Sequence, residues 1–334
     1  MILKKIPILF FKIKNRFYKE VVSFFRKTSF YPKIYKSYWH YLFSGKPKES
    51  TIHNYYSAIP NPGAGIGHQM ANWIAGYWFA GQFGLQFAHI PFSNEKWDSF
   101  LGFGEKEIHV DYLVSKGYKK VRLPLFDEYN EKEIALNKKI IASYSNQKVV
   151  FVAEQDQSYS NQFGVMDAIK QKFHTAPARK KEKIIFDSKS FNIAIHVRRG
   201  DIVIGQENQN PNLLLRWQGN DYFENVLNAV IANIKTTKPV TIYLFSQGLE
   251  TDFPQFSQFS NLHFCLDMNA QDSFLHMVNA DLLITSKSSF SYKPALLSNG
   301  IKVCPNNFWH SYPVKTDWIL VDDNGTFDCN KLNI

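Results

Sequence analysis

Short apolar runs alternate with longer amphipathic stretches through the second half of the chain. We predict buried strands at the apolar runs, residues 191–197, 240–245, 262–266, 281–285 and 301–304. We predict helices at the stretches between or after them, residues 221–235, 271–279 and 289–299. This alternation is typical of a parallel, doubly wound α/β sheet, whose ligands lie at the carboxyl ends of the strands.

The first half carries the same alternation less regularly. Its predicted strands are residues 87–92 and 148–152, and its predicted helices are residues 68–83, 134–142 and 165–174. A charged stretch with a proline, residues 176–183, interrupts the pattern and is the best candidate for a domain boundary. We therefore predict an N-terminal α/β domain over residues 51–182 and a C-terminal Rossmann-like domain over residues 183–334.

Residues 1–50 differ from the rest of the chain in charge. They hold 12 of the 39 basic residues and 2 of the 29 acidic residues, so they carry the whole net charge of +10. The remaining body is electrically balanced, which argues against a nucleic-acid-binding face. Apolar residues between positions 10 and 25 recur with helical spacing, and basic residues largely occupy the other sides of this predicted helix.

This basic N-terminal arm has two interpretations. A helix with an apolar side and a basic side can lie on an anionic membrane surface, here through residues 1–30, or it can pack on the protein itself or on a partner. The uncharged run from Ile6 to Phe11 is too short to cross a bilayer. We expect a cytoplasmic protein held peripherally at a membrane. We favour this over a location in the Golgi membrane, which should require a membrane anchor.

Polar side chains gather where the strand predicted at residues 191–197 ends. They are His196, Arg198, Arg199 and Asp201. Arginine is rarely buried without a partner, and its planar guanidinium group binds phosphate through two hydrogen bonds at once. Two adjacent arginines at this position therefore predict either a phosphate site or a structural ion pair with nearby acids.

Two further segments could approach an anion. A glycine-rich turn with Gly63, Gly65 and Gly67 precedes the helix predicted at residues 68–83, and a serine-rich turn follows the strand predicted at residues 281–285. Glycine lets the backbone approach a ligand closely, and a helix N-terminus presents free N–H groups. Each segment also has a simpler interpretation, as a turn before a core helix or as a serine N-cap.

An aromatic group in the first half is formed by Trp97, Phe100 and Phe103. Aromatic rings stack well on sugar rings, so these side chains could line a groove that binds a glycan. Aromatic residues at this spacing more often belong to the hydrophobic core, because they bury a large apolar surface. We favour the core interpretation.

Three stretches of the chain resemble motifs of the alpha-1,2-fucosyltransferases, a glycosyltransferase family 11-like group of the fucosyltransferase superfamily. His196-Val-Arg-Arg-Gly-Asp201 resembles the donor-site motif of that superfamily. Gly65-Ile-Gly-His-Gln69 is similar to a Gly-x-Gly-Asn-Gln stretch, with His at the Asn position. Lys287-Ser-Ser-Phe-Ser291 is similar to Asn-Ser-Ser-Phe-Ser, and Tyr292-Lys293 follows it where the group carries two tryptophans.

The resemblance implies a GT-B-like fold, in which two Rossmann-like domains face a donor cleft. It implies an inverting transfer of fucose from GDP-fucose to a hydroxyl of a glycan acceptor, with an alpha-1,2 linkage favoured. It also implies that Arg198 binds the β-phosphate and supports the departure of GDP, and that Asp272 binds guanine. The other donor-binding residues that it implies are His196, Arg199, Ser288, Ser289, Phe290, Gly65, Gly67 and Gln69.

An inverting transfer also needs a base for the acceptor hydroxyl. Glu207 lies at nearly the offset from the arginine motif at which alpha-1,6 enzymes carry a Glu, and Asp201 is the alternative; Glu207 could also be a solvated loop acid. The chain has no Asp-x-Asp pair, and its three cysteines show no zinc-ligand spacing. We expect no metal and no cofactor, because two arginines and a helix N-terminus could neutralise the departing diphosphate.

Three other functions stay open. The same scaffold could use another nucleotide sugar, it could bind a nucleotide or glycan without catalysis, or the basic arm could be the functional part and bind a membrane or a nucleic acid. The partners that we expect are a GDP-sugar and an oligosaccharide or lipid-linked glycan acceptor, with an anionic membrane surface at residues 1–30. No nucleic acid is expected, because the body carries no net charge.

Overall fold

The structure is a computed structural model of the 334-residue chain. It describes residues 20–45, 51–61, 63–153, 163–203, 208–266, 268–309 and 311–332. Residues 1–19, which include most of the amphipathic helix predicted in the arm, lie outside the described residues. So does Glu207, one of the two candidate bases.

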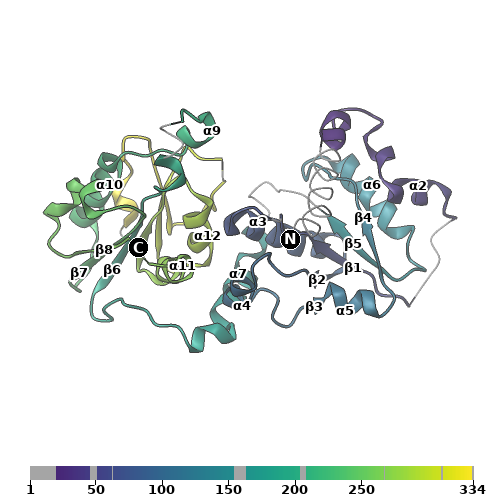
Figure 1. Cartoon of the computed structure of the whole chain (residues 1–334), viewed down its shortest axis with the longest axis horizontal. Coiled ribbons are helices and arrows are strands. Elements are labelled where there is room, and N and C mark those ends of the chain that lie inside the picture. The colour runs from purple at the N-terminus through teal and green to yellow at the C-terminus, as the bar shows by residue number, and fades with distance from the viewer. Residues whose placement is uncertain are drawn as a thin grey trace, which may run out of the picture. The chain divides into compact units, whose positions relative to one another are not determined.

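The first sheet has five parallel strands in the order β3-β2-β1-β5-β4 (Figure 1). Their bounds are β1 Tyr55–Ala58, β2 Gln86–His89, β3 Ile108–His109, β4 Lys119–Arg122 and β5 Val149–Ala153. The helices of this part are the 3-10 helix η1 (Tyr31–Ile34), α2 (Lys36–Phe43), α5 (Val110–Ser115) and α6 (Glu131–Ala142). Every residue of β5 is buried, which explains why this strand could be predicted from its apolar run.

The second sheet has six parallel strands in the order β11-β10-β9-β6-β7-β8. Their bounds are β6 Phe191–His196, β7 Val240–Phe245, β8 Leu262–Cys265, β9 Leu282–Ile284, β10 Ile301–Pro305 and β11 Trp318–Val321. The chain runs outward from β6 to one edge through β7 and β8, then returns to the other side of β6 for β9 to β11. This is the doubly wound strand order of Rossmann folds.

The remaining helices are α3 (Ile66–Gln82), α4 (Glu95–Leu101), α7 (Met166–Thr175), α9 (Pro211–Leu214), α10 (Asn220–Asn233), α11 (Ala270–Asn279) and α12 (Ser289–Leu297). Short 3-10 helices are η3 (Pro177–Lys180), η4 (Glu250–Asp252), η5 (Pro254–Gln258) and η6 (Cys329–Leu332). The prediction of an α/β fold with two parallel sheets is confirmed.

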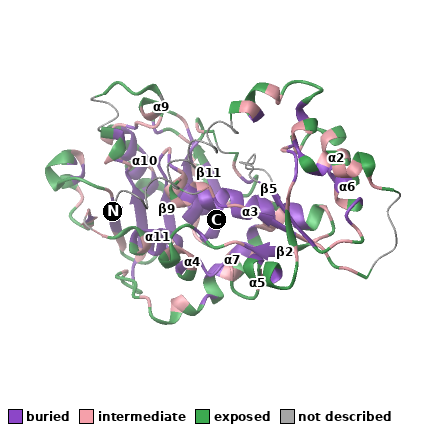
Figure 2. Cartoon of the chain, turned by 45° about the vertical axis from the view of Figure 1, so that its right-hand side comes forward, coloured by how far each residue is buried: buried purple, intermediate pink, exposed green. Residues whose placement is uncertain are grey.

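Alternate residues of β6 pack into separate cores on the two faces of the second sheet. Figure 2 shows the neighbouring strand β9 as buried. Ile193 and Ile195 pack in one core with Phe223 and other residues of α10. Ala194 packs in the other core, which contains Met277 of α11 and residues of α12. A strand buried on both faces carries a nearly continuous apolar run, which is the pattern from which this strand was predicted.

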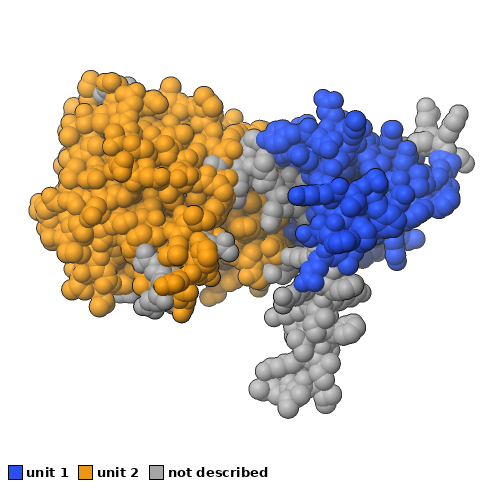
Figure 3. Space-filling model, turned by 90° about the horizontal axis from the view of Figure 1, so that it is seen from above, with its two compact units in different colours: residues 1–59, 79–89, 108–155 blue, residues 60–78, 90–107, 156–334 orange. Residues whose placement is uncertain are grey.

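Two compact units divide the described chain, and neither is one continuous stretch (Figure 3). Unit 1 comprises residues 1–59, 79–89 and 108–155, and unit 2 comprises residues 60–78, 90–107 and 156–334. The predicted boundary after residue 182 lies between the two sheets in sequence, but α4 and α7 belong to unit 2. Rings of Phe100 and Phe173 from these helices contact Phe274 of α11, which explains this grouping.

Within the part of the chain that the structure describes, no helix combines the length and the apolar character needed to cross a membrane.

Candidate functional site

The centre of the second sheet brings two of the predicted motifs together. β6 and β9 are parallel neighbours, and the strand order reverses between them. His196 ends β6 and Ser286 follows the end of β9; the His196 Nδ1 and the Ser286 Oγ are 2.8 Å apart. Both side chains are buried. Ligands of doubly wound sheets bind outside the strand ends at this reversal, so the contact marks the candidate site.

His196 is held in its neutral form. Burial, and to a lesser extent the nearby charges of Arg198 and Arg199, lowers the pKa of His196 from 6.5 to about 3. A buried imidazole beside two guanidinium groups would pay a large desolvation cost if it were charged. At neutral pH this side chain can therefore position neighbours by hydrogen bonding without adding to the positive charge.

We expect acid to destabilise the protein through His196. Between pH 6.5 and about 3 the unfolded chain protonates this side chain and the folded chain does not, so the free energy of unfolding falls as the pH falls. The slope from one such group is at most about 1.4 kcal/mol per pH unit. Denaturant unfolding at several pH values should give a shallower slope for His196→Gln than for the wild type. Equal slopes would contradict the buried, neutral state.

Arg198 and Asp201 form an ion pair directly after β6. The Arg198 Nη2 lies 2.8 Å from the Asp201 Oδ2, and the Arg198 Nε lies 3.4 Å from the Oδ1. Gly200 between them has a φ of 65°, a conformation that favours glycine. The Arg198 side chain is 19% exposed and that of Asp201 is 59% exposed. Arg198 is thus a cation at the edge of the site that is bound to an exposed carboxylate.

Arg199 is buried, and its guanidinium group donates hydrogen bonds to other groups of the protein. Its Nη1 donates to the carbonyl oxygens of Arg198 and Gln218 at 2.9 and 3.1 Å, and its Nη2 donates to the Asn220 Oδ1. Its guanidinium carbon lies 4.4 Å from the centre of the Trp217 ring. Burial lowers the pKa of Arg199 to about 10, while Asp252 acts in the opposite direction, so the group stays charged at neutral pH.

Gln218 connects the arginine motif to the serine-rich turn. Its backbone carbonyl accepts from Arg199, and its side-chain Oε1 accepts from the backbone N–H of Lys287 at 2.7 Å. The Lys287 Nζ pairs with Asp323 at 2.8 Å, and this hydrogen bond lowers the pKa of Asp323. Gln218, Asn220 and Trp217 were not predicted from the sequence. No local pattern marks them, because they reach Arg199 from the loop before α10 and from the first residue of that helix.

The serine-rich turn caps α12. The Ser288 Oγ accepts from the backbone N–H of Phe290 at 3.2 Å, so the prediction of a serine N-cap is confirmed for Ser288. Ser288 is buried, whereas Ser289 and Phe290 are half-buried. The Phe290 ring centre lies 5.5 Å from that of His196. The start of α12 therefore lies beside the end of β6.

The glycine-rich turn approaches the same helix end. A Cβ on Gly67 would lie 2.8 Å from the Ser289 Cβ and 2.9 Å from its carbonyl oxygen, so only glycine fits at position 67 without a shift. Gly65 has open space around it. Gln69 is buried and bridges the turn to the loop after β2, because its Nε2 donates to the Ala64 carbonyl at 2.8 Å and to the Ser93 Oγ at 2.7 Å.

Asp272 lies in the exposed first turn of α11. The Asn269 Oδ1 caps this helix by accepting from the backbone N–H of Asp272 at 3.0 Å, and the Asn269 Nδ2 donates to the Asp272 Oδ2 at 2.6 Å. α11 packs beside α12, as the 6.0 Å between the ring centres of Phe274 and Phe290 shows. The structure therefore holds an oriented carboxylate on the helix next to the serine-rich turn.

Comparisons with known proteins give weak similarities. No family model and no curated protein matches the chain. POFUT1 in complex with GDP is 11% identical, with a TM-score of 0.47 over 77% of this chain and 99% of that chain. Fucosyltransferase NodZ from Bradyrhizobium is 12% identical, with a TM-score of 0.40 over 75% and 94%. A variant of Arabidopsis thaliana FUT1 in complex with GDP is 10% identical, with a TM-score of 0.45 over 83% and 76%. Similarity at this level does not establish what this chain binds or does.

The predicted aromatic group belongs mainly to the core of unit 2. Phe100 and Phe103 are buried, as the core interpretation expected. Trp97 is half-buried, and its ring centre lies 5.7 Å from that of Phe274 and 6.5 Å from that of Phe290. Of the three, Trp97 alone combines exposed surface with contact to the ring beside His196.

Two predictions about the site stay untested. Glu207 lies outside the described residues, so the choice between it and Asp201 as the base is open. Among the described residues no three His, Cys, Asp or Glu side chains gather closely enough to hold a metal ion. Metal independence nevertheless stays a prediction.

Proposed function

We propose that this protein is a glycosyltransferase, an inverting and metal-independent fucosyltransferase that moves fucose from GDP-fucose to a hydroxyl of a glycan, with an alpha-1,2 linkage favoured. The observation that carries the proposal is the contact between His196 and Ser286 at the reversal of the strand order. It joins the arginine motif to the serine-rich turn, and Gly67 brings the glycine-rich turn to the same helix.

The chemistry of the site supports the departure of a diphosphate. Transfer of a sugar leaves negative charge on the leaving nucleotide, and fixed donors in a partly dry site stabilise that charge. Arg198 supplies a partly exposed guanidinium group, and the first turn of α12 supplies backbone N–H groups and the dipole of the helix. A diphosphate would replace the Asp201 carboxylate on Arg198 with an anion that accepts the same pair of hydrogen bonds.

The roles of the two arginines follow from their surroundings. Arg198 is paired with an exposed carboxylate, so we assign it to the β-phosphate. Arg199 is buried among protein acceptors, so we assign it to holding the Arg198 backbone and the loop of Gln218 in place. His196, neutral and bonded to Ser286, positions the serine-rich turn in the same way.

A guanine-binding role for Asp272 completes the proposed donor site. A carboxylate can accept from the guanine N1–H and from its exocyclic amino group together. The Asn269 contact orients the Asp272 carboxylate on the helix beside α12. The proposal also includes an oligosaccharide or lipid-linked glycan as the acceptor and Glu207 or Asp201 as the base. It further includes a peripheral attachment of residues 1–30 to an anionic membrane.

The test is donor binding and hydrolysis by the purified full chain in EDTA, with GDP-fucose, GDP-mannose and UDP-sugars compared. We expect selective binding and slow hydrolysis of GDP-fucose. Preference for another sugar nucleotide would reject the donor but keep the scaffold, and bound GDP-fucose without turnover on any acceptor would indicate a binding protein. Binding of none of them would reject the proposed function, and loss of activity in EDTA would reject metal independence.

Asp272→Ala should raise the Michaelis constant for GDP-fucose about tenfold or more. Hydrogen bonds to a charged group contribute about 1.5–3 kcal/mol each, and the variant loses the acceptor without touching the phosphate site. Asp167→Ala is the matched control, because Asp167 is also an exposed aspartate in the first turn of a helix of unit 2. An unchanged constant in Asp272→Ala would remove Asp272 from the donor site.

A further inference from the structure

Helix α2 presents one side to unit 1 and the other to solvent. On the inner side, the Ser37 Oγ donates to the Arg122 carbonyl at 2.7 Å, and the His40 Nε2 lies 3.2 Å from the Ser143 carbonyl. On the outer side, three large apolar side chains are 42%, 47% and 81% exposed: Trp39, Leu42 and Phe43. We call these three residues the aromatic face. Soluble proteins rarely leave such a group uncovered on one helix.

Two contacts orient the rings of the aromatic face. The Trp39 Nε1 donates to the Lys33 carbonyl at 2.6 Å, so the polar atom of this indole already has its partner. The Trp39 and Phe43 rings stack with their centres 6.1 Å apart and their planes 13° apart. Trp39 could therefore enter an apolar medium without leaving an unsatisfied donor, and little side-chain freedom would be lost.

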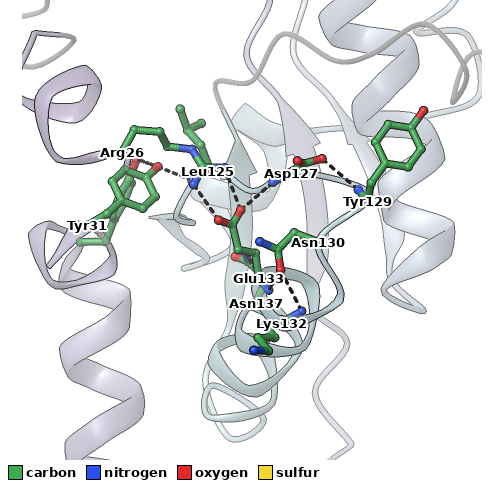
Figure 4. Close-up of polar contacts among 10 residues, drawn as sticks. Arg26, Tyr31, Leu125, Asp127, Tyr129, Asn130, Lys132, Glu133 and Asn137 are labelled. Carbon is green, nitrogen blue, oxygen red and sulfur yellow. Dashed lines mark hydrogen bonds and ion pairs between the residues drawn. The ribbon is translucent and has the colours of Figure 1, made fainter. Parts of the chain in front are cut away.

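The chain before α2 is fixed to the rest of unit 1 by polar contacts of Arg26 and Tyr31 (Figure 4). Both terminal nitrogens of Arg26 pair with the Glu133 carboxylate of α6, at 2.8 and 2.7 Å. The backbone N–H of Leu125 donates to the Tyr31 hydroxyl at 2.9 Å. Tyr31 and Tyr35 are buried, so this segment is part of the body of unit 1.

The stretch of sequence that carries the aromatic face contains basic residues and no acidic ones. Lys27, Lys33 and Lys36 are exposed, and no acidic residue occurs between Glu20 and Glu49. Lys33 links two aromatic groups: its carbonyl holds Trp39, and its ammonium lies 5.5 Å from the centre of the exposed Phe30 ring. The centres of protein–protein interfaces are poor in lysine, whereas aromatic residues flanked by lysines are typical of surfaces that bind anionic bilayers.

We infer that the aromatic face binds the interface of an anionic lipid bilayer, with Trp39 and Phe43 at the boundary between headgroups and acyl chains and with Lys33 and Lys36 against lipid headgroups. This extends the membrane part of the proposed function to a second contact outside residues 1–30, and it does not depend on the transfer reaction. Stable attachment to a bilayer commonly needs two such signals.

The experiment is co-sedimentation of the full chain with vesicles of phosphatidylcholine, with and without phosphatidylserine. Trp39→Ser/Phe43→Ser should lower the affinity for phosphatidylserine vesicles about tenfold or more, because burial of one aromatic side chain already contributes about that factor. Lys33→Gln and Lys36→Gln should each lower it about fivefold, and they should not change binding to pure phosphatidylcholine.

Two control variants separate this surface from other causes. Tyr112→Ser/Tyr129→Ser removes aromatics of unit 1 that are 54% and 71% exposed, and it should leave vesicle binding unchanged. Lys12→Gln/Arg16→Gln/Lys19→Gln tests residues 1–30 by themselves. GDP-fucose binding measured on every variant keeps a failure of the donor site distinct from a failure of membrane binding.

Three results would overturn the inference. Trp39→Ser/Phe43→Ser could bind vesicles like the wild type, or it could change only the self-association of the chain, which would assign the face to a second copy. An environment-sensitive dye on Leu42→Cys, in a Cys329→Ser background, gives an independent readout that leaves Trp39 and Phe43 in place. Its emission should shift to the blue with phosphatidylserine vesicles, and no shift would reject the contact.

Discussion

Arg198→Ala is expected to slow fucosyl transfer from GDP-fucose by about 10²–10³-fold, which corresponds to roughly 3–4 kcal/mol in the barrier. The guanidinium group of Arg198 is partly exposed, and its described side-chain hydrogen bonds go to Asp201. Its removal takes away the cation that we assign to the leaving diphosphate. Single-turnover transfer or donor hydrolysis measures the effect.

The fold should survive this substitution. An i,i+3 ion pair with an exposed carboxylate contributes little to stability, so the melting temperature of Arg198→Ala should stay close to that of the wild type. Arg198→Lys is the matched variant: it keeps the charge but cannot make two parallel hydrogen bonds, and it should recover only part of the rate. Turnover at the wild-type rate in Arg198→Ala would reject the site assignment.

Arg199→Ala is expected to lower the free energy of unfolding by about 3 kcal/mol or more. The substitution removes charged hydrogen bonds to two carbonyls and to Asn220, and it leaves these partners without their donor in a buried place. It also removes the cation that lies over the Trp217 ring. Denaturant unfolding measures the loss, with Arg198→Ala as the comparison because it changes the same residue type one position away.

The two neighbouring arginines should thus give opposite results. Arg198→Ala loses turnover and keeps stability, whereas Arg199→Ala loses stability and should regain little of it in Arg199→Lys, whose ammonium group cannot reach three separated acceptors. A stable Arg199→Ala protein that loses only donor binding would place Arg199 on the nucleotide, as the resemblance to the fucosyltransferases implied.

Most of the strands that were predicted from the sequence are interior strands, although the interior strand β1 was missed and the edge strand β8 was predicted. β6, β7 and β9 lie inside the second sheet, where both faces are covered and most residues are apolar. β3, β4 and β11 were not predicted, and each lies at the edge of its sheet. Lys119–Arg122 of β4 reads as a polar segment because edge strands carry side chains that face water.

The candidate site could be predicted only where its residues lie in one stretch of sequence. Arg198, Arg199 and Asp201 follow a recognisable strand, and the spacing of Ser288 before an apolar helix predicted its role as a cap. Gln218 was out of reach, because its contacts to Arg199 and Lys287 join positions that are 19 and 69 residues away. Folding alone brings these positions together.

Asp201 has a consequence for the end of the catalytic cycle. The Asp201 carboxylate lies three residues from Arg198 in the chain, so it always competes with the diphosphate of GDP for this guanidinium group. Its high effective concentration favours re-formation of the ion pair when the contact with GDP breaks. We expect Asp201→Ala to bind GDP more tightly and to release it more slowly, as stopped-flow displacement would measure. An unchanged release rate would contradict this. Asp201 pairs with Arg198 before the donor binds, and the same carboxylate would then speed the release of GDP. It would lower the affinity for GDP and raise the turnover rate.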